Sequence, residues 1–264
     1  MSVFSSSVAM SDIAATLRAA GCVFAEDEAE LIVATARTPD ELAAMLERRV
    51  SGQPLEHVLG WAEFCGLRLV VEPGVFVPRP RTEFLIGQAV ALARGIPGTP
   101  VVLDLCCGTG AMGAALAAGL ARPAELHAAD LDPAAVRCAR HNLPGGHVYE
   151  GDLYEPLPAT LRGRVELLIA SPPYVPSGSV GLLPSEARLY EPRVALDGGD
   201  DGLDVVRRVI AQAPEWLAPG GHLLVETSER QAADTVRAVE QAGLAARATG
   251  SDDLDATAVI GTLP

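Results

Sequence analysis

Residues 101–110 read Val101-Val102-Leu103-Asp104-Leu105-Cys106-Cys107-Gly108-Thr109-Gly110, and this stretch decides the fold. Its apolar part, 101–105, predicts a buried strand, and the glycines that follow predict a tight turn into a helix over 110–121. The same order returns at 125–130, where a strand ends and Asp132-Pro133 predicts the first residues of the next helix. Strands that alternate with helices in this way are typical of an α/β fold with a parallel sheet.

The rest of the chain continues this alternation. Strands are predicted at 147–150, 165–170, 222–227 and 257–263, and helices at 203–217 and 229–242. These elements indicate a doubly wound sheet, in which ligands bind at the carboxyl ends of the strands. Residues 175–202 are rich in glycine and proline and too long for a simple connection, which is typical of a lid or substrate loop.

The N-terminal fifth of the chain has a different character. Residues 11–52 are predicted to form helices, one of which begins at the capping box Thr38-Pro39-Asp40-Glu41. Loose alternation of apolar residues around Gly66 predicts a hairpin within 54–80. We therefore expect a small helical domain over 1–52, a hairpin and linker over 53–81, and the α/β domain over 82–264.

Composition narrows the function. The chain has 264 residues, of which 49% are hydrophobic and 20% charged, and no apolar stretch is long enough to span a membrane. Its net charge is −14, and all twenty basic residues are arginine. An acidic surface repels phosphate backbones, so stable nucleic-acid binding is not expected. We expect a monomer.

The termini and cysteines indicate the compartment. Residues 1–7 have neither a basic region nor a long apolar core, so they do not resemble a signal peptide. The five cysteines are odd in number and lack CxxC spacing, which predicts reduced thiols in the cytoplasm. The five histidines show no ligand pairing, so no metal is expected.

Acidic residues follow three successive predicted strands. Asp104 is a poor neighbour for a pyrophosphate but a good one for an ammonium or sulfonium group. Asp130 could accept both hydroxyls of a ribose. Asp152 could accept from an adenine amino group, with Leu153 packed against the ring. Gly108, Gly110 and Gly113 also match the spacing G-x-G-x-x-G, a weak signal by itself.

These features together favour S-adenosylmethionine over NAD as the cofactor. Each feature also has an interpretation without a role in binding. The glycine turn could only pack a helix on a strand, Asp130 could be a solvated strand end, and Asp152 could be a turn aspartate. The cysteines of the turn are interpreted as small residues in a tight turn, because no histidine or arginine is placed to lower their pKa. The candidate cofactor residues are Asp104, Cys106, Cys107, Gly108, Thr109, Gly110, Asp130, Leu131, Asp152, Leu153 and Ser171.

A second chemical motif is Ser171-Pro172-Pro173-Tyr174, which ends the strand at 165–170. Two prolines cannot continue a sheet, since neither has an N–H and both have a fixed φ. Their carbonyls are then free to accept hydrogen bonds, between a polar side chain and an aromatic ring. Such a pocket suits a planar NH2 group and predicts chemistry on an amide or amino nitrogen, with these four residues as the catalytic candidates.

Together, these motifs resemble the release-factor glutamine methyltransferase family, which methylates the N5 nitrogen of a glutamine in a Gly-Gly-Gln loop. The resemblance extends over most of the chain from about residue 47. Three further segments carry it: Gly52-Gln53-Pro54-Leu55-Glu56-His57-Val58-Leu59-Gly60, Val77-Pro78-Arg79-Pro80-Arg81-Thr82-Glu83, and the segment 190–203. The family has Asn-Pro-Pro-Tyr where this chain has Ser171, and the chain resembles a divergent branch.

The resemblance implies a seven-stranded Rossmann-like methyltransferase sheet and a small N-terminal helical domain that grips a protein substrate. It also implies that the first side chain of the tetrapeptide and the carbonyl of Pro172 hold the amide, while Tyr174 packs on its plane. Methyl transfer from S-adenosylmethionine is then an in-line displacement without a metal. Ser171 can still accept a hydrogen bond, but from a shorter arm than asparagine.

Other functions remain open at this point. A small-molecule N-methyltransferase of a specialised pathway is one alternative, since the N-terminal domain is short. A nucleobase amino-methyltransferase is another, because Ser-Pro-Pro-Tyr is similar to the tetrapeptide of cytosine-N4 DNA methyltransferases. The last is a non-catalytic binding protein that keeps the fold.

Overall fold

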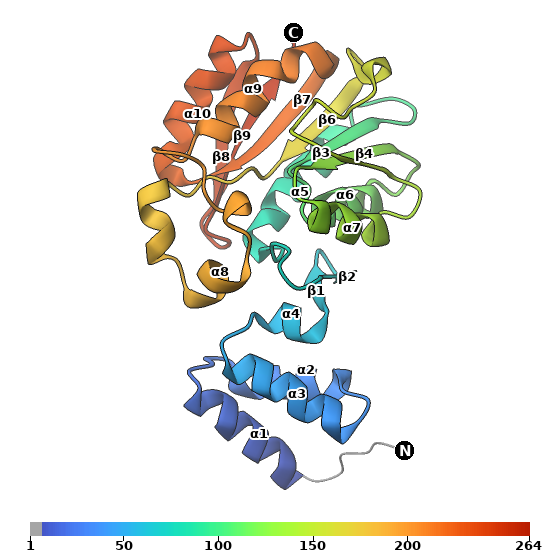
Figure 1. The fold of residues 1–264 in the computed structure, drawn as a ribbon. Coiled ribbons are helices and arrows are strands. Elements are labelled where there is room, and N and C mark those ends of the chain that lie inside the picture. Colours follow the sequence, from blue (N-terminus) through green and yellow to red (C-terminus); the bar gives the residue numbers. More distant parts are fainter. Residues whose placement is uncertain (1–6) are drawn as a thin grey trace.

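A seven-stranded sheet forms the larger part of the computed structural model, which describes residues 7–264 (Figure 1). Its strand order is β5-β4-β3-β6-β7-β9-β8, with parallel pairing up to β7 and antiparallel pairing beyond it. The predicted doubly wound sheet is therefore confirmed. The strands are β3 Val101–Leu105, β4 Glu125–Asp130, β5 His147–Glu150, β6 Val165–Ala170, β7 Leu217–Thr227, β8 Ala245–Ser251 and β9 Ala256–Thr262.

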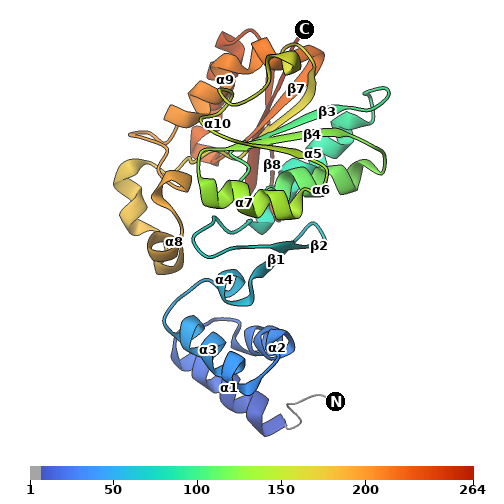
Figure 2. The same cartoon turned by 45° about the vertical axis from the view of Figure 1, so that its right-hand side comes forward.

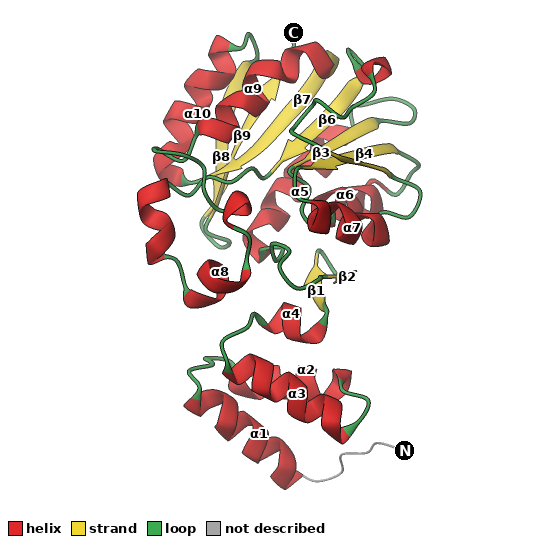
Figure 3. Ribbon diagram, in the orientation of Figure 1, coloured by secondary structure: helices red, strands yellow, loops and turns green. Residues whose placement is uncertain are grey.

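Helices cover both faces of this sheet (Figure 3). Successive side chains of a strand point to opposite faces. Leu103 accordingly packs in one apolar core with the helices α9 and α10, and Val102 in another with α5 and α6. The helix α7 adds to the second face through contacts with β4 and β5. The bounds are α5 Glu83–Ala93, α6 Ala111–Leu120, α7 Pro133–Asn142, α9 Asp204–Trp216 and α10 Glu229–Gln241.

The N-terminal part forms a separate apolar cluster below the sheet (Figure 2). Its elements are α1 Ser7–Ala19, α2 Ala25–Thr35, α3 Pro39–Val50 and α4 Leu55–Leu59. The hairpin of β1 Trp61–Phe64 and β2 Leu67–Val70 follows, and its Phe64 and Leu69 pack in the core with α5 and α6. Thr38 caps α3, as predicted, because its Oγ1 accepts from the Glu41 amide at 3.1 Å. The short helix α4 was not predicted. Residues 1–6, on which the signal-peptide interpretation rests, lie outside the described residues.

Two features of the sheet differ from the sequence expectations. The strand β8 was not predicted, because most of its side chains are exposed at the sheet edge and carry no apolar pattern. The strand β7 begins at Leu217 rather than at 222. It passes Gly221, where an added Cβ would lie 2.7 Å from the carbonyl oxygen of Val165, so only glycine lets the two strands approach.

Residues 175–202 leave the sheet and reach the N-terminal helices. This connection contains α8 Ser185–Tyr190 and two short 3-10 turns. Arg49 of α3 donates to Glu186 at 2.6 Å, and the Tyr190 hydroxyl donates to the carbonyl of Ser51 at 3.0 Å. Arg49 is itself buried and bound to Glu28 at 2.6 Å. The connection thus joins the two parts of the chain. Within residues 7–264, no helix has the length and apolarity that crossing a membrane requires.

Candidate active site

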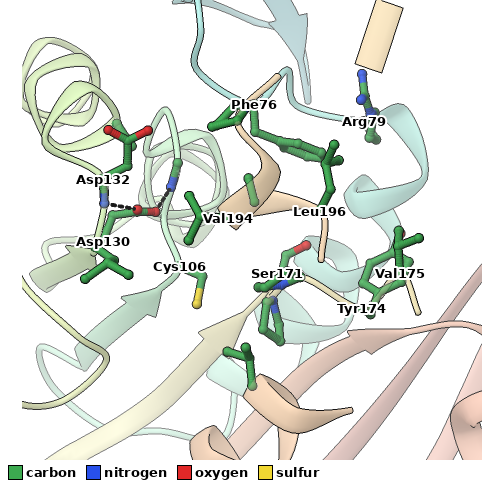
Figure 4. Close-up of a pocket in the computed structure, with 18 of the residues that line it drawn as sticks. Phe76, Arg79, Cys106, Asp130, Asp132, Ser171, Tyr174, Val175, Val194 and Leu196 are labelled. Carbon is green, nitrogen blue, oxygen red and sulfur yellow. Dashed lines mark hydrogen bonds between the residues drawn. The ribbon is translucent and has the colours of Figure 1, made fainter. Parts of the chain in front are cut away.

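A cavity of about 630 Å³ opens at the carboxyl ends of β3, β4 and β6 (Figure 4). This is where the strand order reverses, the position at which doubly wound sheets bind ligands. Ten of the candidate residues line it: Cys106, Gly108, Asp130, Leu131, Asp152, Leu153, Ser171, Pro172, Pro173 and Tyr174. The other four candidates, Asp104, Cys107, Thr109 and Gly110, are buried behind the cavity wall.

The two glycines of the turn after β3 have different surroundings: the first lies at the cavity and the second at a tight packing contact. Gly108 has φ +54° and lines the cavity, and an added Cβ there would meet no atom within 4 Å. At Gly110, with φ +76°, an added Cβ would lie 3.0 Å from Leu143. The first glycine therefore serves the left-handed turn beside the cavity, and the second lets the chain pack closely against the end of α7.

Asp130 is held by the backbone around it. Its Oδ2 accepts from the amide of Gly108 at 2.8 Å and its Oδ1 from the amide of Asp132 at 2.9 Å (Figure 4). Burial raises the pKa of the Asp130 carboxyl, while these two bonds lower it. Each carboxylate oxygen keeps a lone pair that can accept from a ligand hydroxyl.

Asp104 lies beneath the turn instead of at the cavity. It is fully buried, and its Oδ2 accepts from the amide of Gly113 at 2.8 Å. Within the described part of the chain its Oδ1 has no hydrogen-bond partner. Burial raises the pKa of this carboxyl to about 8. The structure therefore places Asp104 beneath the turn and not on the cavity lining, whereas the sequence interpretation put it beside a cofactor ammonium or sulfonium group.

Asp152 and Leu153, which follow β5, also line the cavity. The Asp152 carboxylate accepts from Arg208 of α9 at 2.6 Å, and the arginine also lines the cavity. Arg208 was not predicted as a site residue, because it belongs to an amphipathic helix that packs on β6 and β7, and the sequence does not show that its side chain reaches the segment after β5. Its charge keeps the acidic side chain in place next to Leu153, which is buried and has φ +50°.

The tetrapeptide forms the far wall. The Tyr174 hydroxyl accepts from Arg81 at 2.6 Å and donates to Glu226 of β7 at 3.3 Å. Burial raises the pKa of Tyr174 to about 12, so its hydroxyl keeps its proton near neutral pH. The Ser171 hydroxyl donates to the same carboxylate at 3.4 Å. Glu226 was not predicted as a site residue, although its strand was.

Comparison with known proteins gives the family. The model of the methyltransferase small domain matches residues 67–182. The release factor glutamine methyltransferase of Geobacter sulfurreducens is 39% identical over 230 residues, which cover 84% of this chain and 78% of that protein. The enzyme of that name from Mycolicibacterium smegmatis is 38% identical over 260 residues, which cover 91% and 90%. The chain belongs to the release factor glutamine methyltransferase family.

This confirms the family inferred from the motifs, while the assignment to a branch with Ser171 stays a prediction. A solved structure supports the fold alone. The 16S rRNA methyltransferase of T. thermophilus, in complex with AdoMet and guanosine, has a TM-score of 0.55 and 20% identity, and the match covers 77% of this chain and 50% of that one.

Two of the three segments that resemble the release factor glutamine methyltransferase family, 77–83 and 190–203, meet at the cavity. Arg79 donates to Glu191 at 2.7 Å, and the amide of Val77 donates to the same carboxylate at 3.1 Å. Phe76 and Leu196, which flank these contacts, line the cavity (Figure 4). Neither was predicted as a site residue, because apolar residues in loops give no chemical signal of their own.

The two cysteines of the turn, Cys106 and Cys107, have the properties of packing residues and not of nucleophiles. Burial raises the pKa of the Cys106 and Cys107 thiols well above the ordinary value, and nearby aspartates raise it further. Both therefore stay protonated and are poor nucleophiles. Among residues 7–264, no three His, Cys, Asp or Glu side chains are grouped as metal ligands would be.

Proposed function

We propose that this chain transfers a methyl group from S-adenosylmethionine to N5, the side-chain amide nitrogen of a glutamine, in a peptide chain release factor. One observation carries the proposal. Ser171, Pro172 and Tyr174 line the same cavity as Gly108 and Asp130, so the acceptor residues and the cofactor residues share one space. The proposal also follows the names of the relatives reported above.

The cofactor side of the cavity fits an adenosine. Asp130 offers free lone pairs for the ribose hydroxyls, and Gly108 lets the backbone approach without a side chain in the way. We assign Asp152 and Leu153 to the adenine. When bound, S-adenosylmethionine supplies an electrophilic methyl carbon on a sulfonium sulfur. Asp104 holds the turn from below and does not touch the ligand in this assignment.

The acceptor side fits an amide. An amide nitrogen is a weak nucleophile, because its lone pair is delocalised into the carbonyl. Acceptors for both N–H groups fix its orientation and aim the nitrogen at the methyl carbon. We assign these roles to the carbonyl of Pro172 and the hydroxyl of Ser171, with the ring of Tyr174 against the amide plane. The carbon–nitrogen bond forms as the carbon–sulfur bond breaks, and the amide proton passes to solvent.

The cavity mouth supports a protein substrate. Leu182 is 84% exposed and Leu189 65% exposed, both on the 175–202 connection, and Val194 lines the cavity while 49% exposed. Exposed apolar side chains on a segment that also lines a cavity are typical of an interaction surface. We assign the helices of residues 1–52 to gripping the release factor. We further propose a monomeric cytoplasmic enzyme without a metal, in line with its five free cysteines.

The test is methyl transfer with a located product. The protein is incubated with labelled S-adenosylmethionine and a release factor, and the modified residue is identified by mass spectrometry. We expect one methyl group on the glutamine of the Gly-Gly-Gln loop and none on a release factor in which that glutamine is alanine. Transfer to another residue, or no transfer, would refute the proposal.

A further inference from the structure

Ser171 raises a chemical problem that asparagine does not. The side-chain oxygen of asparagine only accepts hydrogen bonds, whereas a serine hydroxyl both donates and accepts. A methyl-accepting amide needs acceptors for its N–H groups and a free lone pair on nitrogen. If the Ser171 hydroxyl donated its hydrogen toward that nitrogen, it would compete for the electrons that form the new bond. Something must therefore hold the Ser171 hydrogen away from the substrate.

Glu226 is placed to do this. Its side chain is only 6% exposed and lines a neighbouring cavity of about 440 Å³, but not the main one. Its Oε2 accepts from the Thr82 hydroxyl at 2.6 Å and from the Ser171 hydroxyl at 3.4 Å. Its Oε1 accepts from Tyr174 at 3.3 Å and lies 3.5 Å from Nε of Arg81. A carboxylate only accepts, so every hydroxyl around it must donate toward it.

We infer that Glu226 is a positioning residue that takes the hydroxyl hydrogen of Ser171 and so presents the serine oxygen to the substrate amide as an acceptor. The inference deepens the proposed function and rests on it. One carboxylate thereby orients the first and last side chains of the tetrapeptide, since Tyr174 donates to it as well. A glutamine at this position would reverse the arrangement, because its NH2 group would donate to Ser171 and free the serine hydrogen to face the substrate.

The experiment compares Glu226→Gln in three backgrounds: the natural chain, Ser171→Ala and Ser171→Asn. We measure kcat and KM for a release factor, and the affinity for S-adenosylhomocysteine by calorimetry. In the natural background we expect kcat to fall about tenfold, the effect of losing one well-placed hydrogen bond. Where residue 171 has no hydroxyl, the same change should cost less than about twofold, because the two residues act as one unit. Within each background, Glu226→Gln should change the affinity for S-adenosylhomocysteine by less than about twofold.

The matched control is Glu229→Gln, an exposed carboxylate that lines the same neighbouring cavity and contacts none of the tetrapeptide. It should change kcat by less than about twofold. An equal loss from Glu226→Gln in all three backgrounds would overturn the inference, as would no loss in the natural one. If Glu226→Gln does not fold, the single changes decide: Ser171→Ala should lose about tenfold and Ser171→Asn should retain activity. Equal activity of both would overturn the inference.

The two proposals fail in different ways. If the natural chain transfers no methyl group, the proposed function is wrong. The positioning role is then judged by calorimetry of a Gly-Gly-Gln peptide binding to the S-adenosylhomocysteine complex. Peptide binding that Glu226→Gln weakens about tenfold, and only when Ser171 is present, supports the role. Any other result, including no binding at all, overturns it.

Discussion

Replacing Asp104 with asparagine should flatten the pH dependence of the free energy of unfolding. The fully buried carboxyl of Asp104 has a pKa raised to about 8 from an ordinary value of 3.8, chiefly by burial. Between these two values the folded chain holds a proton that the unfolded chain has lost. The contribution of Asp104 to stability is therefore greatest below the unfolded pKa and is lost as pH rises through the folded pKa.

The size of the effect follows from this shift. Integrating the proton difference from about pH 6 to pH 8 gives a loss of about 2 kcal/mol for the natural chain, since one pKa unit is worth about 1.4 kcal/mol. The asparagine variant has no proton to lose at this position. Its stability relative to the natural chain should thus rise by about 2 kcal/mol over the same range. Other titrating groups cancel in the difference, apart from those that interact with Asp104.

Urea unfolding of both chains at about pH 6, 7 and 8, without cofactor, measures this difference. The variant Asp253→Asn, which removes an exposed carboxylate from the turn between β8 and β9, controls for the loss of one negative charge. Parallel pH profiles for the natural chain and Asp104→Asn would show that the buried carboxyl does not hold a proton near neutral pH. The reasoning from burial would then be refuted.

Two further changes test the cofactor site and the N-terminal helices. Asp130→Asn should weaken S-adenosylhomocysteine binding about tenfold or more by calorimetry, because an amide cannot accept from ribose hydroxyls at both positions, while exposed Glu150→Gln should leave it unchanged. Arg49→Met should lower the free energy of unfolding by about 3 kcal/mol, since it leaves the carboxylate of Glu28 buried without its partner. Arg18→Met, at an exposed ion pair, should cost less than about 1 kcal/mol in the same urea titration, and equal losses for the two arginines would contradict the argument.

The central parallel strands β3 and β6 were predictable from the sequence because they are buried on both faces. The strand Val101–Leu105 is a continuous apolar run interrupted only by Asp104, and the strand 165–170 ends abruptly at two prolines. The apolar runs and the residues that end them therefore predicted that Asp130 and Ser171 lie at one edge of the sheet. The strand β8 has alanine, arginine, threonine and glycine at an exposed edge, so no periodicity distinguished it from a loop.

Of the site, only the residues that follow the ends of predicted strands could be predicted from the sequence. Asp104 lies near the end of β3, one of the strands that border the cavity. The close approach of α6 at Gly113 nevertheless buries its side chain beneath the turn. Arg208 and Glu226 come from elements that were predicted, but their roles depend on which neighbours the packing brings near. Sequence order does not state that a carboxylate 55 residues after Ser171 lies against its hydroxyl. Such contacts follow from the register of β6 on β7.

The contacts of the 175–202 connection with the N-terminal helices have a thermodynamic consequence. Glu186 lines the cavity and is bound to Arg49 of α3, so one ion pair connects the cavity lining to this helix. A protein that binds the helices and a ligand that fills the cavity would both affect this set of contacts. By linkage, if binding of the protein changes the affinity for the ligand by some factor, binding of the ligand changes the affinity for the protein by the same factor. Binding of a protein at these helices and binding of a ligand in the cavity are in this way coupled equilibria.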